Sequence, residues 1–379
     1  MPLCDLIIDR ITTDGPISFH DFMEMCLYYP ELGYYTSTRD KLGKNGDYYT
    51  SSFLTQAFGA MIGRQLEEMW AILGEEEFTI VEYGAGTGLL SHDVLNYLRR
   101  NAKFYDRLKY CIIEKSAAMT ETAKLFLAGE EKVEWHNSID EIHDITGCIL
   151  SNELINNFAV HQVVMEEELM EVFVDYDNGF KEILLPARRQ LTDYLDELNI
   201  ALPRGFRTEI NLQAHDWIRE IGTSLARGYV ITIDYGFNSK ELYASFRNGG
   251  TLICYNKHSV NEHFYQDIGC QDITSHVNFS ALCHWGIKND LLFCGYTNQA
   301  HFLLSLGITD YLKQSIEKEP DNYINYKKEA FLKRTLLVDM GSKFKVLLQR
   351  KGIEQQGLMG LRLNNQALHP AKMDLSLVA

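Results

Sequence analysis

The chain has 379 residues, of which 46% are hydrophobic, and it carries a formal net charge of -16 at pH 7. This apolar fraction allows a large buried core and excludes a globally disordered chain. The negative charge argues against a duplex nucleic-acid partner, which requires a basic protein face, so we expect no nucleic-acid binding.

The eight cysteines stand singly, without a Cys-x-x-Cys pair, so we predict no metal site and a reducing compartment. Asp5 and Asp9 interrupt the apolar residues near the N-terminus, which argues against a secretory signal or a transit peptide. No apolar run has the length that spans a bilayer. We therefore expect a cytoplasmic protein without membrane insertion.

The first part of the chain, residues 1–75, is predicted to form an N-terminal helical segment. A short helix is expected near His20–Leu27. Leu54–Leu73 is the clearest helix, because its apolar residues recur at steps of three and four. Ser51 or Ser52 is expected to cap its start.

Tyrosines are concentrated in the loop between these two helices. Either they form a lid over a bound ligand or they pack as an ordinary loop; the residues concerned are Tyr34, Tyr35, Tyr48 and Tyr49.

Strands and helices alternate over the next part of the chain. The predicted strands are Phe78–Gly86, Lys109–Ser116, Val133–Ser138 and Gly147–Leu154, and helices are expected over Leu89–Arg100 and up to Leu127. Alternation with apolar strands predicts an α/β, Rossmann-like fold with a mostly parallel sheet and helices on both faces.

The pattern changes at about residue 158, where antiparallel hairpin material begins. Asp177-Asn178-Gly179 predicts its turn, and a polar helical stretch follows up to about Ala226. Arg227–Gly236 is expected to resume the parallel sheet. Later strands are expected within residues 249–258, 290–296 and 344–352.

We accordingly expect a core over residues 76–352 with an inserted α/β subdomain at about 158–226. Residues 353–379 are weakly patterned and are expected to form a loosely held C-terminal tail.

The glycine-rich loop Glu82-Tyr83-Gly84-Ala85-Gly86-Thr87-Gly88 lies after a predicted strand and opens a helix. Glycine permits positive φ there and lets the backbone approach a ligand closely. The N–H groups at the start of the helix add a positive dipole end. This context favours a ligand-binding loop over a purely structural turn.

The spacing of the loop distinguishes between ligands. A dinucleotide fingerprint would place its third small residue at position 89, where this chain has Leu89. Glu82 stands two residues before Gly84, and its carboxylate would repel a pyrophosphate. It suits the positively charged methionine end of S-adenosylmethionine, directly or through water. No Gly-Lys-Ser/Thr ends the loop, which excludes phosphate-loop chemistry.

Glu114 closes the second predicted strand. In doubly wound folds an acidic residue at this place hydrogen-bonds the ribose hydroxyls. By itself it could equally be a solvated strand end, and its pairing with the glycine loop favours the functional interpretation.

The chain resembles the class I S-adenosylmethionine-dependent methyltransferases and, more narrowly, the MidA family, which includes a mitochondrial complex I assembly factor that acts as a protein arginine methyltransferase. The resemblance covers nearly the whole chain. The blocks that carry it are residues 15–35, 46–52, 82–95, 151–161 (SNELINNFAVH), 231–236 (ITIDYG), 249–258, 272–282 (DITSHVNFSAL) and 340–352.

The resemblance implies a cofactor site for S-adenosylmethionine and a protein substrate, with arginine as the methylated side chain. The cofactor-binding residues it implies are Glu82, Gly84, Ala85, Gly86, Thr87, Gly88, Glu114, Asn137 and Asn152. Glu153 is the candidate that holds a guanidinium, and Asn152 is a positioning acceptor. Asp272 and His276 form a second wall, with His276 as a base near neutral pH or as a hydrogen-bonded core histidine. A homodimer stays open.

The chain departs from the family pattern at Asn156, Asn157, Ala159 and Asn278, and in the Ser51–Phe53 stretch. These departures motivate a second hypothesis, a catalytically impaired S-adenosylmethionine-binding factor that assembles a respiratory or other complex. A nucleotide-dependent oxidoreductase is a third hypothesis, against which Leu89 and Glu82 argue.

Overall fold

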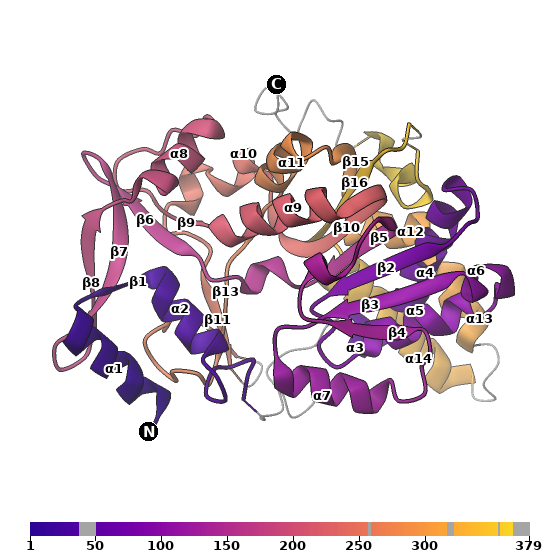
Figure 1. The fold of residues 1–379 in the computed structure, drawn as a ribbon, viewed down its shortest axis with the longest axis horizontal. Helices are drawn as coiled ribbons and strands as arrows, with labels where there is room; N and C mark the ends of the chain where they lie inside the picture. The colour runs from indigo at the N-terminus through magenta and orange to yellow at the C-terminus, as the bar shows by residue number, and fades with distance from the viewer. Residues whose placement is uncertain (38–50, 257–258, 317–321, 355–356, 367–379) are drawn as a thin grey trace.

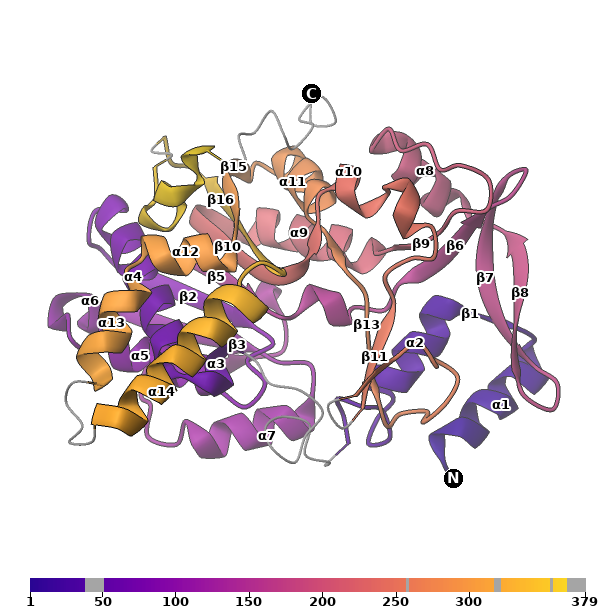
Figure 2. The ribbon, with the colours of Figure 1, turned by 180° about the vertical axis from the view of Figure 1, so that it is seen from behind.

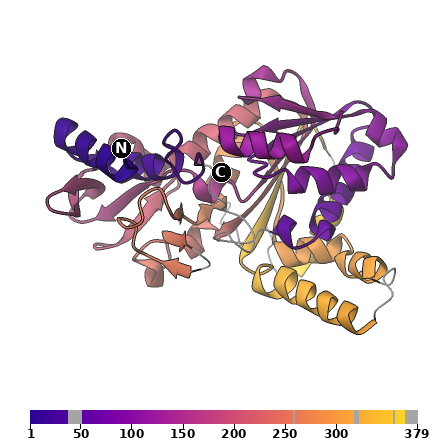
Figure 3. The same ribbon diagram turned by 90° about the horizontal axis from the view of Figure 1, so that it is seen from below.

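The computed structural model describes residues 1–37, 51–256, 259–316, 322–354 and 357–366. A large lobe is built on a long central sheet, and a smaller lobe around a second sheet lies beside it (Figure 1). Seen from below, the N-terminal helices lie at one end of the molecule, and the orange helices near the C-terminus cover the central sheet at the other (Figure 3).

The central sheet has the strand order β15-β16-β10-β5-β2-β3-β4, and the short β14 pairs with β10. From β4 to β10 neighbouring strands are parallel, while β16 is antiparallel to both of its neighbours. The strands are β2 (Phe78–Tyr83), β3 (Leu108–Ile113), β4 (Val133–His136), β5 (Ile145–Asn152), β10 (Leu225–Phe237), β14 (Val277–Asn278), β15 (Leu292–Asn298) and β16 (Phe344–Lys351). The predicted Rossmann-like, mostly parallel sheet is confirmed.

Helices cover both faces of this sheet, and each face has its own hydrophobic core. Residues of α4, α5, α12 and α13 pack on one face, which Figure 2 shows from behind, and residues of α9 and α11 pack on the other. The helices of this lobe are α3 (Ser51–Leu54), α4 (Gln56–Ile72), α5 (Leu89–Leu98), α6 (Ala102–Asp106), α7 (Ala117–Phe126), α9 (Leu212–Ser224), α10 (Ser239–Leu242), α11 (Phe279–Lys288), α12 (Gln299–Ser305), α13 (Ile308–Ile316) and α14 (Asn322–Lys333).

The predicted long helix at 54–73 is present, but its cap differs from the prediction. Thr55 is the N-cap of α4, and its hydroxyl accepts a hydrogen bond from the Ala57 N–H. Ser51 and Ser52 belong to the separate short helix α3, because the extended backbone of Thr55 interrupts the helical path.

The second sheet combines the predicted hairpin with the N-terminus of the chain. It has the order β1-β7-β6-β9, and β8 pairs with β7. The predicted turn at Asn178, which has φ 55°, joins β7 to β8. The elements of this lobe are α1 (Leu3–Asp14), β1 (Ile17–Ser18), α2 (Phe19–Tyr28), β6 (His161–Met165), β7 (Leu169–Tyr176), β8 (Phe180–Pro186), α8 (Arg189–Glu197) and β9 (Arg207–Ile210).

Two features of this region differ from expectation. The polar stretch before Ala226 contains β9 between two helices, because residues 207–210 pair antiparallel with β6. The apolar run at 249–258 contributes β11 (Ile253–Asn256) to a separate three-stranded sheet with β12 (Ser259–Asn261) and β13 (Asp272–Thr274), not to the central sheet.

The α1 and α2 helices share a third hydrophobic core with these two small sheets, whereas α4 packs on the central sheet. The two parts of the N-terminal segment therefore belong to different cores.

The described part of the C-terminal tail is packed rather than loosely held. Leu358 is 2% exposed and Leu361 9% exposed, and both belong to the core that contains α4 and α12. The Met359 N–H donates to a Glu68 carboxylate oxygen at 2.7 Å, which fixes the start of this segment. Among the described residues, the helices are too short or too polar to cross a membrane.

Candidate active site

A cavity of about 990 Å³ lies at the carboxyl ends of β2, β3, β5 and β10. Ligands of open α/β sheets bind at this edge. Tyr28 and Tyr35 line the cavity from the N-terminal region, and Tyr255 lines it from the small three-stranded sheet. The predicted site residues that line it are Glu82, Gly84, Ala85, Gly86, Thr87, Glu114, Asn137, Asn152, Glu153, Asp272 and His276.

The glycine loop has the backbone conformation that its sequence predicts. Gly84, Gly86 and Gly88 have φ values of 68°, 57° and 82°. A Cβ added to Gly86 would meet no atom within 4 Å, so open space lies over this backbone. Gly88 does not line the cavity: it is the N-cap of α5, and a Cβ there would lie 3.0 Å from Leu127. Its place in the cofactor site stays a prediction, and its position at the start of α5 gives it a structural role as well.

The Glu82 side chain is held by hydrogen bonds from α5 and β3. Its Oε2 accepts hydrogen bonds from the Ser91 hydroxyl at 2.5 Å and the Tyr110 hydroxyl at 2.7 Å. Burial raises the pKa of this carboxyl group above its ordinary value. Because both bonds go to Oε2, Oε1 retains its acceptor capacity toward a ligand.

Glu114 ties the end of β3 to the glycine loop. Its Oε2 accepts the Gly86 N–H at 3.1 Å and its Oε1 accepts the Ser116 N–H at 2.9 Å. A carboxylate has about four acceptor positions, so capacity for ribose hydroxyls remains. Asn137 follows β4 at the same edge, and its amide donates to Glu141 at 3.2 Å.

Asn152 is the last residue of β5, and Glu153 follows it in an unusual backbone conformation. Glu153 has φ 53°, and its N–H donates to the Ile233 carbonyl at 2.9 Å. The Asn152 amide donates to Glu153 Oε1 at 3.4 Å. Asn152 Oδ1 is buried and has no hydrogen-bond partner among the described residues. Strained, non-glycine residues of this kind cluster at ligand sites.

Three carboxyl groups are close enough to interact electrostatically at this end of the cavity. Burial, and then the charge of Asp234, raise the pKa of Glu153 to about 8, and Asp272 adds to the shift. Burial raises the pKa of Asp234 to about 7. Asp234 Oδ2 accepts the N–H groups of Ile155 and Asn156 at 2.9 and 3.1 Å.

Asp234, which is not a cavity-lining residue but raises the pKa of Glu153, was not among the predicted site residues. The signal was present, because this residue stands in the ITIDYG block near the carboxyl end of a predicted parallel strand.

Asp272 and His276 also line the cavity, and their role as a second wall stays a prediction. Asp272 Oδ2 accepts the Tyr35 hydroxyl at 2.9 Å. The His276 ring centroid lies 5.2 Å from that of Tyr235 and 5.0 Å from that of Phe237. Burial, helped by nearby cations, lowers the pKa of His276 to about 4, so the ring is neutral at pH 7.

The predicted lid tyrosines do not act together. Tyr35 lines the cavity, whereas Tyr34 is 2% exposed and packs in the core of the small lobe. Tyr48 and Tyr49 lie outside the described residues.

The residues that depart from the family pattern lie in different places: some line the cavity and one does not. Asn156 and Asn157 line the cavity, and so does Ser52. Asn278 does not line it; its Oδ1 caps α11 by accepting the Ala281 N–H at 3.1 Å.

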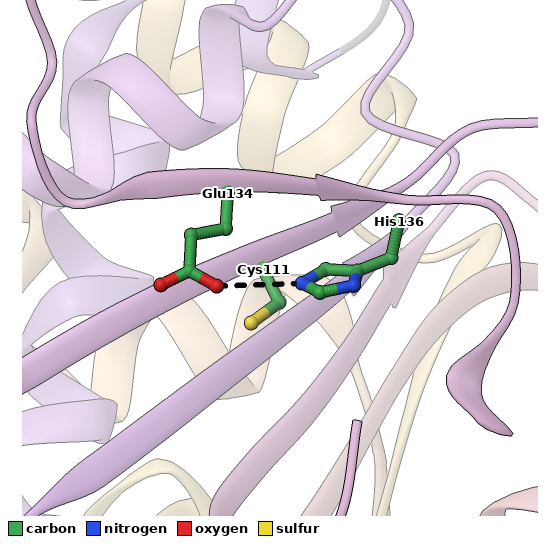
Figure 4. Close-up of side chains that lie close together, drawn as sticks. All are labelled: Cys111, Glu134 and His136. Carbon is green, nitrogen blue, oxygen red and sulfur yellow. Dashed lines mark ion pairs between the residues drawn. The ribbon is translucent and has the colours of Figure 1, made fainter. Parts of the chain in front are cut away.

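A second cluster of metal-ligand type lies at the β3–β4 edge of the sheet. Figure 4 shows Cys111 from β3 close to Glu134 and His136 on β4, with 3.6 Å between the imidazole and the carboxylate. Lys109 Nζ contacts the same Glu134 oxygen at 2.8 Å, so an ammonium group already neutralises this carboxylate. We assign no metal to this cluster.

The residues around the cavity have the features that S-adenosylmethionine binding requires. Open space lies over Gly86, Glu114 offers acceptor positions at the end of β3, and Asn152 presents an unpaired buried oxygen. Its volume is at the upper end of the ~300–1,000 Å³ range of small-molecule sites, which leaves room for an acceptor side chain beside the cofactor.

Comparisons with known proteins agree with this geometry. Residues 61–297 match the family described as "Putative S-adenosyl-L-methionine-dependent methyltransferase". The chain superimposes with a TM-score of 0.83 on a Burkholderia thailandensis protein solved with bound S-adenosyl-homocysteine. The two are 29% identical, and the match covers 95% of this chain and 94% of the other.

Two curated relatives are protein arginine methyltransferases by name. "Protein arginine methyltransferase NDUFAF7 homolog, mitochondrial" of Caenorhabditis elegans is 26% identical, with 89% of this chain and 84% of the relative covered. The Homo sapiens protein of the corresponding name is 25% identical, with 84% and 76% covered. Because these relatives are named as mitochondrial, the expected cytoplasmic location is contradicted.

Proposed function

Because the chain belongs to this family of S-adenosyl-L-methionine-dependent methyltransferases, we propose that it methylates an arginine side chain of a protein. Its cofactor is S-adenosyl-L-methionine. The names of the relatives supply the arginine. The observation that carries the proposal is a group of three carboxyls: Glu153 and Asp272 line the cavity, and the buried Asp234 lies close enough to raise the pKa of Glu153.

At the cofactor end, the glycine loop and Glu114 would hold the nucleoside and Glu82 would lie near the methionine end. The bound cofactor supplies an electrophilic methyl group on a sulfonium centre. The hydrogen bond from the Gly86 N–H to Glu114 couples the loop to β3, so both can present one preformed surface. Methyl transfer needs alignment and exclusion of water more than covalent help from the protein.

At the acceptor end, Glu153 would bind the guanidinium. Mutual repulsion with Asp234 and Asp272, added to burial, keeps this carboxyl protonated near pH 7 in the free protein. A guanidinium is always charged, so its arrival favours ionisation of Glu153 and relieves the repulsion. Asn152 would position the acceptor nitrogen through its unpaired Oδ1.

His276 is better suited to accept a hydrogen bond than to act as a base. With a pKa near 4 it holds a proton weakly at neutral pH. Its buried Nδ1 has no hydrogen-bond partner among the described residues. We propose that this nitrogen accepts a hydrogen bond from the substrate group that receives the methyl. The rings of Tyr235 and Phe237 hold the His276 ring in place.

The alternative of a factor without turnover rested on Asn156 and Asn278. Asn278 caps a helix outside the cavity, so its change from aspartate removes no carboxylate from the site. Glu153, Asp234 and Asp272 remain. The arginine methyltransferase is the better supported of the two.

The test is incubation of the purified chain with methyl-labelled cofactor and arginine-containing peptides, followed by mass spectrometry of the modified residue. We expect label on guanidinium nitrogens and its loss in Glu153→Gln. Label on lysine or on a carboxyl group would replace arginine as the acceptor. Saturable cofactor binding without transfer to any peptide or extract protein would favour the factor without turnover.

A further inference from the structure

One wall of the cavity carries positive charge that a bound guanidinium does not explain. Lys343 and Lys345 line the cavity at the start of β16. Lys345 is half-buried, and its Nζ donates to the Ser342 carbonyl at 2.5 Å. Neither ammonium group has an ion pair with the part of the chain that the structure describes.

The third lysine that lines the cavity is neutralised within the chain. Lys115 Nζ contacts a Glu24 oxygen at 2.6 Å. Asp339, which lines the cavity four residues before Lys343, has Arg334 at 3.7 Å. Among the described lysines that line the cavity, unpaired positive charge is therefore confined to the wall formed by Lys343 and Lys345.

The wall lies on the acceptor side of the site. Lys345 is the register partner of Asp234 across β10 and β16. In the strand order β16-β10-β5-β2, the glycine loop follows a strand three steps away, or about 14 Å at ~4.8 Å per strand. The methionine end of the cofactor, with its carboxylate, is expected near Glu82 on β2, so an anion bound at Lys345 would belong to the acceptor.

The physical setting of Lys345 favours an anionic ligand. Burial lowers the pKa of its ammonium group below the ordinary value. A partly desolvated cation gains from a charge-assisted hydrogen bond, and a carboxylate is the matching acceptor. Phe344 and Tyr235, whose ring centroids are 5.6 Å apart, provide apolar surface next to it.

We propose that Lys345, assisted by Lys343, is a specificity residue that binds a carboxylate of the substrate close to the methylated arginine. This inference rests on the proposed arginine methylation. The site would thus recognise a pair of opposite charges: the guanidinium at Glu153 and an acidic group at the lysine wall. The carboxylate is either an aspartate or glutamate side chain or the free C-terminus of the substrate.

A set of peptides tests the inference. Each contains one arginine, with alanine, glutamate or lysine neighbours, and with a free or an amidated C-terminus. We expect kcat/KM about tenfold higher for the peptide with an acidic group than for the neutral one. Amidation of the peptide C-terminus removes the preference only if the C-terminal carboxylate is the group that binds Lys345. Lys345→Ala should abolish the preference, and Lys345→Glu should reverse it toward lysine neighbours.

The control is Lys351→Ala, at the opposite end of β16, where Nζ donates to the Gly222 carbonyl outside the cavity. Dissociation constants of the same peptides, measured by fluorescence anisotropy with S-adenosyl-homocysteine present, give a readout without turnover. Methylation of neutral and acidic peptides at equal rates, with equal affinities, would overturn the inference and leave arginine methylation standing. So would a tenfold loss of cofactor affinity in Lys345→Ala, which would assign the lysine to the cofactor.

Discussion

Glu153 follows the last residue of β5 with φ 53°, a conformation that costs a residue with a side chain energy unless its surroundings hold it. The Ile233 carbonyl accepts its N–H, and Asn152 contacts its carboxyl group. The strain and the raised pKa occur in one residue at the junction of the cofactor and acceptor ends of the cavity. This coincidence is why we place the guanidinium there.

The ionisation of Glu153 should govern the pH dependence of activity. Its pKa is raised to about 8 in the free protein, so the ionised form that binds guanidinium increases as the pH rises. We expect kcat/KM to rise between about pH 7 and pH 9, and Glu153→Gln to lower it by about 100-fold or more and to flatten this limb. Initial rates over the pH range measure both. A wild-type profile that falls through this range would contradict the assigned role.

Gly86 is where backbone and ligand should approach most closely. Gly86→Val would place a branched side chain in the open space over the loop, and we expect cofactor affinity to fall by about 10- to 100-fold. Calorimetry measures the affinity. Gly205→Val is the matched control, because Gly205 also has positive φ and open space but lies outside the cavity. An equal loss in both variants would mean that backbone strain alone is responsible.

At the scale of elements, the site depends on how strands end and helices begin. β2, β3, β5 and β10 end along one edge, and the helices that follow the loops fix the positions of those ends. The α4 helix has no cavity-lining residue, yet it supplies much of the core beneath this edge. Its role is to support the sheet.

The start of α4 offers a test of its cap. Thr55→Ala removes the side-chain acceptor of the Ala57 N–H, and we expect the free energy of unfolding to fall by about 1 kcal/mol. Urea denaturation followed by circular dichroism measures the change. Thr122→Ala, on the exposed side of α7, should change stability by less than about 0.5 kcal/mol. No loss in Thr55→Ala would contradict the cap.

At the scale of the whole molecule, the cavity is assembled from parts that are far apart in sequence. The N-terminal region, the central sheet, the small three-stranded sheet and the turn before β16 all line it. The predicted division at residues 75, 158, 226 and 352 stays a prediction. The core shared by α1, α2 and the small sheets supports, as our proposal, one lobe formed from both the N-terminal segment and the insertion.

The C-terminal segment should contribute to the stability of the large lobe. Leu358→Ala would leave a cavity in the core that contains α4, and we expect a loss of about 2–4 kcal/mol in the free energy of unfolding. Leu363→Ala on the same segment, where the side chain is 51% exposed, should cost less than about 0.5 kcal/mol. Urea midpoints of the two variants compare them directly. Equal midpoints would mean that the segment is loosely held.

The sequence by itself determined the parts of the protein that depend on local pattern. Apolar periodicity and the strand–glycine loop–helix succession predicted the Rossmann-like sheet and the cofactor, since both follow from residues that are neighbours in the chain. The hairpin turn at Asn178 was predictable for the same reason. The cap at Thr55 was missed because several polar residues precede α4 and only the backbone path selects one of them.

Only the tertiary structure decided which distant residues share the site. Asp234 and Lys345 become neighbours through the pairing of β10 with β16, which lie more than a hundred residues apart in the chain. Burial, not residue type, separates the neutral His276 from a base of ordinary pKa, and it raises the pKa of Glu153. Burial and long-range pairing are properties of the folded chain, so the cofactor was predictable from a local motif, whereas Asp234, Lys345 and the pKa shifts at the acceptor end were not.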